Sequence, residues 1–541
     1  GHQRRARALL AGLPTLWPTR GQVSVEPASY QSVWRAPPIA RLSLLHMATP
    51  RLALWPLCLL ACAAAAPVSL GGGYAVIFDA GSTGTRVHVY RYERSADSSV
   101  PPRVWAVPGG SMKVKPGVSS FASEPSTAGA SIRPLLEFAA STVPEAEQAS
   151  AIVFLHATGG MRLVPEPIRG LLYDALYRSV QEYPSKLKAS RESFSTLSGE
   201  LEGVYGFLSV NYLLAKVGQI SPTEIGTVGA LDLGGASTQI TTPLPRSATD
   251  NGHAGTISIP LPSRRGKRES RVFSHSHLGF GNKQVMAALT GTELAACLPS
   301  DACANGAWEL ISGPTSGGFC GTGSPVACEA GIVRALGKFD HTVGQPSIDG
   351  RRFIGMSLLY YAVNFARLAG YLERREPPRY SVAELGTAAH ALCAEPYSRL
   401  FVRLKGRDPL TPDGAMAWRC FDLLYASRLL SDGYGLSRED AVVEFYGEID
   451  GMEVEWTLGA LHSYLAEMNS RRGDSPLPGA EGSNRAPSHS PAAAGFNGYT
   501  SSAILVIFLA AGLLLAVFGY HLSRNSSRLS LSTYEEVNRR A

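Results

Sequence analysis

Two short stretches of this sequence combine an acid, small residues and hydroxyl groups in the same order. The first runs Asp79-Ala-Gly-Ser-Thr-Gly-Thr-Arg86, and the second runs Asp232-Leu-Gly-Gly-Ala-Ser-Thr-Gln239. Small residues let a backbone approach a ligand closely, while hydroxyls and free N–H groups suit phosphate oxygens. An acid at the end of a strand can hold a cation through water. This chemistry suits a phosphate chain bound together with a metal ion.

The flanking residues predict a strand, a tight turn and a second strand at both places. Residues 74–78 are apolar and β-prone, residues 87–92 alternate, and an apolar run also surrounds the second stretch at residues 230–240. One such hairpin is common, but its repetition indicates two similar halves that share a ligand cleft. The chain lacks the Gly-Lys-Ser/Thr ending of a Walker A motif, which excludes P-loop chemistry.

Two segments between the loops extend this interpretation. Residues 151–155 predict a buried strand that leads to Thr158 at a ligand-facing edge, although an ordinary strand-to-helix turn is the alternative. Residues 198–214 have helical spacing, with Ser198 as the expected cap. Glu200 and Glu202 fall in the first turn, where they either complement the helix dipole or direct a carboxylate into the cleft.

Composition indicates a globular protein outside the nucleic-acid-binding classes. The 541 residues are 45% hydrophobic and 17% charged, which allows two or three domains. The formal net charge is +6, but residues 1–46 carry six Arg against one Glu, leaving +1 for the rest. A nucleic-acid partner therefore has little support.

The two ends suggest passage through the secretory pathway. Residues 1–46 contain no Met and are expected to be a non-native leader, and residues 47–66 resemble a signal peptide, with an uncleaved anchor as the alternative. Residues 470–498 are expected to form a Ser/Pro/Gly-rich stalk. The uncharged apolar run at 503–520 predicts a transmembrane helix, and residues 521–541 a cytosolic tail.

The cysteines fit an oxidising compartment. Signal-peptide removal leaves six of them, which predict three disulfides whose pairing stays open. No two of the six form a C-x-x-C pair, so a zinc site is disfavoured. The six are Cys297, Cys303, Cys320, Cys328, Cys393 and Cys420.

Taken together, the motifs resemble those of the apyrases, or nucleoside triphosphate diphosphohydrolases, of the GDA1/CD39 group. The similarity rests on residues 79–86, 157–162, 202–213 and 232–239, and shorter motifs at residues 276–281, 357–361 and 456–459 continue it. It covers about residues 74–468. Gly84-Thr-Arg86 replaces the Ser-His-Thr of many cell-surface members, so the first loop is most similar to that of Golgi, plant and protist members.

This resemblance implies an α/β fold of two RNase H-like halves, as in actin, sugar kinases and Hsp70, with the active site between them. Residues 71–197 would form the first half, completed by a helix near 459–469, and residues 198–458 the second.

The resemblance also implies roles for individual residues. Glu202 would be the general base, and Asp79 and Asp232 would hold Ca²⁺ or Mg²⁺ through water. The other implied residues are Thr158, Ser237 and Gln239 for placing the attacking water and the metal; Ser82, Thr83, Gly84, Gly234, Gly235 and Ala236 for the phosphates; and Tyr361 and Tyr434 for the base. His88 and His156 are expected to be structural.

The expected protein is thus a membrane-anchored hydrolase of nucleoside di- and triphosphates, with its catalytic domain in the Golgi lumen or outside the cell. A phosphotransferase or polyphosphate hydrolase of the same fold is one alternative, and a nucleotide-binding protein without catalysis is another. Glu202 and its Gly-Val-Tyr-Gly context favour the nucleotide hydrolase over the first, and the complete acidic set disfavours the second. Base preference, diphosphate against triphosphate preference and oligomeric state stay open.

Overall fold

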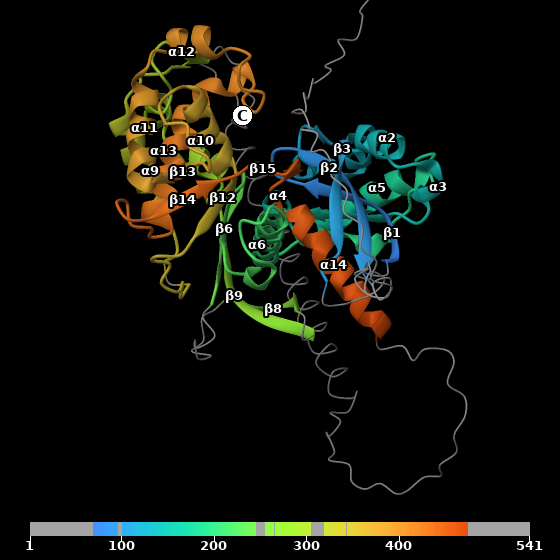
Figure 1. The fold of residues 1–541 in the computed structure, drawn as a ribbon. Coiled ribbons are helices and arrows are strands. Elements are labelled where there is room, and N and C mark those ends of the chain that lie inside the picture. The colour runs from blue at the N-terminus through green and yellow to red at the C-terminus, as the bar shows by residue number, and fades with distance from the viewer. Residues whose placement is uncertain are drawn as a thin grey trace, which may run out of the picture. The chain divides into compact units, whose positions relative to one another are not determined.

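The computed structural model describes residues 69–95, 100–244, 255–263, 266–304, 319–341 and 343–473, which lie in one compact unit beginning at Ser69. They form an α/β fold with two large sheets and helices on their faces (Figure 1). The predicted leader, signal peptide, transmembrane segment and tail lie outside these residues. Among the described helices, none is both long and apolar enough to cross a membrane.

The first sheet has five strands in the order β3-β2-β1-β4-β5. β1 pairs antiparallel with β2 and parallel with β4, so it lies at the centre. Its residues Ala75 to Phe78 are fully buried and alternate between two cores, as expected for a strand covered on both faces. The strands are β1 (Ser69–Ala80), β2 (Thr85–Ser95), β3 (Arg103–Val114), β4 (Ile152–Ala157) and β5 (Phe194–Thr196).

The second sheet repeats this arrangement. Its order is β13-β14-β12-β6-β7-β9-β8, and the middle strands β9-β7-β6-β12-β14 match the first sheet in order and direction. The two glycine loops therefore occupy equivalent places, after β1 and after β6. The strands are β6 (Gly229–Leu233), β7 (Ser237–Pro243), β8 (Thr256–Ser263), β9 (Gly266–Leu278), β12 (Phe353–Ser357), β13 (Arg379–Ser381) and β14 (Val442–Phe445); the short pairs are β10 (Cys303–Ala304) with β11 (Phe319–Cys320) and β15 (Glu448–Ile449) with β16 (Met452–Glu453).

The helices form three layers around the two sheets. α2 and α5 cover one face of the first sheet, and α10, α11 and α13 pack on one face of the second. α6 and α14 lie side by side in the layer that both sheets share (Figure 1). The helices are α1 (Ala128–Ser131), α2 (Arg133–Thr142), α3 (Glu145–Gln148), α4 (Gly159–Arg162), α5 (Glu166–Glu182), α6 (Gly199–Lys216), α7 (Asn282–Ala288), α8 (Gly291–Ala296), α9 (Pro325–Leu336), α10 (Leu358–Leu368), α11 (Val382–Ala394), α12 (Tyr397–Leu404), α13 (Arg419–Arg428) and α14 (Trp456–Gly473).

The sequence explains where the central helices begin and end. Ser198 caps α6, because its side chain accepts a hydrogen bond from the backbone N–H of Leu201 at 3.2 Å, as predicted. α14 contacts β1 and β2 as well as α6, although its chain position is far from both strands. This helix continues to Gly473, into the first residues of the segment predicted as a stalk, whose bounds stay a prediction. The division of the chain into halves at residue 197 stays a prediction.

The six cysteines form the three disulfides that the sequence predicts. The pairs are Cys297–Cys328, Cys303–Cys320 and Cys393–Cys420. The third joins α11 to α13, and the first links the end of α8 to α9. These two lie in the core beneath the second sheet's helices, whereas Cys303–Cys320 joins the short strands β10 and β11.

Candidate active site

The two glycine loops contact each other. Each follows a central strand and precedes its antiparallel partner, so Asp79 lies opposite Arg86 and Asp232 opposite Gln239. A Cβ atom placed on Gly235 would lie 2.5 Å from Ser82 Oγ and 2.8 Å from Thr83 Cγ2. Glycine at this position is therefore needed for the close approach of the two loops.

A third turn, after β4, packs against both loops. The Thr158 backbone N–H donates to the carbonyl of Ala80 at 3.3 Å, and Thr158 is buried. Cβ atoms placed on the next two glycines would lie 2.8 Å from Ser237 Oγ and 2.8 Å from the Cα of Ser82, respectively. The structure thus brings Thr158 beside both hairpins.

Glu202 lies in the first turn of α6 at the centre of a hydrogen-bond network. Its carboxylate accepts a close hydrogen bond from Arg162 and one from Gln239 Nε2 at 3.1 Å. Gln239 also donates to Ser237 Oγ at 2.9 Å and to Ser276 Oγ at 3.0 Å. Arg162 Nη1 donates to Ser276 Oγ at 3.0 Å. The network places the carboxylate beside the strand that follows the second loop, where the charges of Asp79 and Asp232 also act on it.

Opposing effects determine the ionisation of Glu202. Burial raises its pKa to about 8, and the charges of Asp232 and Asp79 act in the same direction. Arg162 opposes them through its charge and its hydrogen bond. A carboxylate with such a pKa can accept a proton near neutral pH, which is the property that a general base needs.

Asp79 and Asp232 have the properties of cation ligands. Burial raises the pKa of each to about 6. One oxygen of each, Oδ1, is buried and has no hydrogen-bond partner among the described residues. An unpaired buried carboxylate oxygen is costly, and a hydrated Ca²⁺ or Mg²⁺ ion prefers oxygen ligands of this kind. The residues present therefore fit the divalent cation that the sequence implies.

Ser357 has a strained backbone, and its side chain contacts the second aspartate, Asp232. It lies between β12 and α10, pairs with Leu233 across the sheet, and has φ 54° and ψ −126°. This conformation is rare for residues other than glycine, and such strain is often found at functional sites. The Ser357 side chain hydrogen-bonds to Asp232 and lowers its pKa against the effect of burial.

The two predicted base-binding tyrosines lie in different environments. Tyr361, in the first turn of α10, is half-buried and hydrogen-bonds to Arg86. Tyr434 is only 1% exposed, and its hydroxyl lies 2.5 Å from Thr238 Oγ1. The prediction that Tyr434 stacks on a base disagrees with this placement, because its ring packs inside the protein near Phe339.

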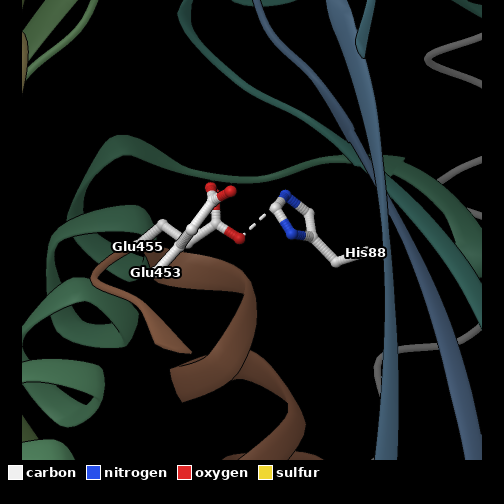
Figure 2. A group of neighbouring side chains, drawn as sticks. All are labelled: His88, Glu453 and Glu455. Carbon is white, nitrogen blue, oxygen red and sulfur yellow. Dashed lines mark ion pairs between the residues drawn. The ribbon is translucent and has the colours of Figure 1, made fainter. Parts of the chain in front are cut away.

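Behind Asp79, an ion-pair cluster joins β2 to the segment before α14. Figure 2 shows His88 facing Glu455, with Glu453 beside them, and His88 Nε2 lies 2.8 Å from Glu455 Oε1. Arg86 Nη1 contacts Glu453 at 2.7 Å and Glu455 at 3.5 Å. Although burial opposes its ionisation, His88 and Arg86 lower the pKa of Glu455 to about 2. Because Arg86 and His88 already contact these carboxylates, the cluster is explained as a polar network without a metal ion.

A cavity of about 680 Å³ opens beside the Glu202 network. Its lining includes Arg162, Ser276 and Arg169, but neither glycine loop. It therefore adjoins the carboxylate network rather than the loops.

Comparison with known proteins identifies the family. The model of the GDA1/CD39 (nucleoside phosphatase) family matches residues 71–476. The chain belongs to this family. Ectonucleoside triphosphate diphosphohydrolase 5 of Gallus gallus is 29% identical over 406 residues, covering 73% of this chain and 88% of that protein. The Golgi apyrase of Schizosaccharomyces pombe is 27% identical over 444 residues, covering 73% and 75%.

A solved structure confirms the fold of this nucleoside phosphatase. A nucleoside triphosphate hydrolase from Neospora caninum superimposes with a TM-score of 0.53 at 14% identity, over 74% of this chain and 93% of that one. The family and its named relatives are hydrolases of phosphoanhydrides, so this chain is an enzyme of that class.

Sequence reasoning missed three residues that contact the nucleoside phosphatase site. Arg162 and Ser276 lie in segments that resemble family motifs, but their types alone do not indicate a contact with Glu202. Ser357 begins another such segment, and its positive φ has no signature in the sequence. For all three residues, the only sequence feature that pointed to the site was their position in a segment resembling a family motif.

Proposed function

We propose that this enzyme hydrolyses nucleoside di- and triphosphates to the monophosphate and phosphate, with Glu202 as the general base. The observation that carries the proposal is the buried Glu202 carboxylate, which Arg162 and Gln239 orient and on which the charges of Asp79 and Asp232, at the two touching glycine loops, act. Phosphoanhydride hydrolysis requires an in-line water, a base for its proton and groups that stabilise charged oxygens. In this proposal Glu202 is the base, and the two glycine loops carry the groups that stabilise the charged oxygens.

Each residue then has a distinct part. Ser237, Gln239 and Thr158 help to place the attacking water and the metal beside Glu202. The loop residues Ser82 to Gly84 and Gly234 to Ala236 bind phosphate oxygens through N–H and hydroxyl groups. A Ca²⁺ or Mg²⁺ ion, held through water by Asp79 and Asp232, would neutralise charge on the phosphates. Tyr361 contacts the base.

The burial and raised pKa of Glu202 also argue against the alternative functions. A binding protein without catalysis would have no need for a buried carboxylate with a raised pKa beside the loops. A sugar kinase needs a second substrate to accept the phosphate, whereas the proposed site directs Glu202 at water.

We also propose that the two sheets are RNase H-like halves and that the enzyme acts in the Golgi lumen or outside the cell. Relatives named Golgi apyrase and ectonucleoside triphosphate diphosphohydrolase support this location. The uncharged run at 503–520 would anchor the enzyme in the membrane. Truncation before residue 503 should release it from sedimented membranes, and a truncated chain that still sediments would contradict the anchor.

The direct test is phosphate release by the full chain from ATP, ADP, UDP and GDP, with Ca²⁺ or Mg²⁺ and then with EDTA. We expect metal-dependent release, and the ratio of diphosphate to triphosphate rates distinguishes a diphosphatase from a broad apyrase. A folded protein that binds nucleotide but releases no phosphate would contradict the proposal.

A further inference from the structure

Three lysines, one in β3, one directly after it and one in α7, surround the touching glycine loops. Lys113 and Lys115 lie at the end of β3 and after it, next to the first loop. A Cβ atom on Gly84 would lie 2.9 Å from Lys113 Cε and 3.5 Å from Lys115 Cγ. Lys283, in α7, lies on the second loop, where a Cβ on Gly235 would be 3.8 Å from its Cδ. The lysines therefore approach one pair of loops from both sides.

These lysines lack the partners that other lysines have. Lys186 and Lys216 form ion pairs with carboxylates at 3.0 Å and 3.1 Å. Within the described ranges, no such pair involves Lys113, Lys115 or Lys283. The first two are exposed to solvent and the third is half-buried, so all three can be reached by a ligand.

Their charges repel one another. The surrounding protein lowers the pKa of Lys113 by desolvation, and the charge of Arg86 lowers it further. Lys115 and Lys283 act in the same direction, and Asp79 opposes them. Lys283 likewise has a lowered pKa, because of burial and the charge of Lys115. A group of cations that repel one another favours a multiply charged anion at the same place.

We propose that Lys113, Lys115 and Lys283 form an anion subsite that holds the phosphate chain of the substrate from both sides of the loops and also takes free pyrophosphate. This inference rests on the proposed function. Asp79, Asp232 and Glu202 place negative charge where a polyanion must bind, and the lysines offset it together with the divalent cation. Affinity then comes mainly from the phosphates and increases with their number, so a triphosphate benefits more than a diphosphate.

The test compares the full-length enzyme with Lys113→Met, Lys115→Met, Lys283→Met and the triple variant. Lys186→Met, which removes an exposed charge away from the loops, is the matched control. KM for ATP and ADP and inhibition by pyrophosphate are measured at one free Mg²⁺ concentration, and pyrophosphate binding is measured by calorimetry. Thermal unfolding verifies that each variant is folded.

We expect each single change to raise KM about fivefold and the triple change about a hundredfold, with kcat changed less than about threefold. Pyrophosphate affinity should fall by the same factors, and KM should depend less on salt in the triple variant. Unchanged KM and unchanged pyrophosphate binding in an enzyme that still hydrolyses ATP would overturn the subsite alone. Lysine-dependent pyrophosphate binding without any hydrolysis would support the subsite and contradict the proposed function.

Discussion

Replacing Arg162 with Gln should move the acid limb of the pH–rate profile. Arg162 donates a close hydrogen bond to Glu202, and both side chains are at least 87% buried, since their exposed fractions are 13% and 9%. Hydrogen bonds to charged groups contribute about 1.5–3 kcal/mol. One pKa unit corresponds to about 1.36 kcal/mol, so the loss should raise the pKa of Glu202 by about one to two units.

The acid limb should shift to higher pH because a general base must be ionised to accept a proton. The pKa of Glu202 is about 8 with Arg162 present, so activity should rise with pH through that value. In Arg162→Gln the rise should occur about one to two units higher, and kcat/KM at pH 7 should fall about ten- to hundredfold. Arg162→Lys should shift the limb less, because it keeps the charge.

The assay is phosphate release at saturating Mg²⁺ between about pH 5 and about pH 11, which spans about three units on either side of the expected pKa. Arg169→Gln is the matched control, since Arg169 lines the adjoining cavity and has no described contact with Glu202. A fall in rate without any movement of the acid limb would refute the reasoning, because Arg162 would then act on something other than Glu202.

Two further predictions concern residues near the aspartates. Ser357→Ala should raise the free Mg²⁺ concentration for half-maximal activity about 10- to 100-fold, because it removes the hydrogen bond that orients Asp232; an unchanged midpoint would exclude this role. Glu455→Gln should lower the thermal unfolding temperature at pH 7. The pKa of Glu455 falls from 4.5 to about 2 in the folded state, so its contribution is complete above pH 4.5 and is lost as the pH falls towards 2. The difference between wild type and variant should therefore shrink below pH 4.5, and a constant difference would contradict the ion-pair account with His88.

Local patterns predicted much of the scaffold. The hairpins around both glycine loops follow from small residues between apolar strands, and α6 follows from its spacing and its Ser198 cap. Both features depend on interactions within a few residues, which a sequence displays directly. The number of disulfides followed from an even cysteine count, whereas their pairing needed the packing of α8, α9, α11 and α13.

The contacts that the sequence did not predict join residues that are far apart along the chain. Arg162 reaches Glu202 across 40 positions, and Ser276 reaches Gln239 across 37, with no periodicity to connect them. The family resemblance placed Tyr434 at the nucleobase, but Thr238 of β7 and the core around it bury the ring. Such outcomes depend on which surfaces of the two sheets meet.

The most direct test of the central claim is turnover by Glu202→Gln. We expect kcat to fall about 10²- to 10⁴-fold, the usual contribution of a positioned base, with nucleotide affinity nearly unchanged. Glu200→Gln is the matched control in the same helical turn and should retain turnover. Near-normal turnover by a folded Glu202→Gln enzyme would show that another group activates the water and would contradict the account.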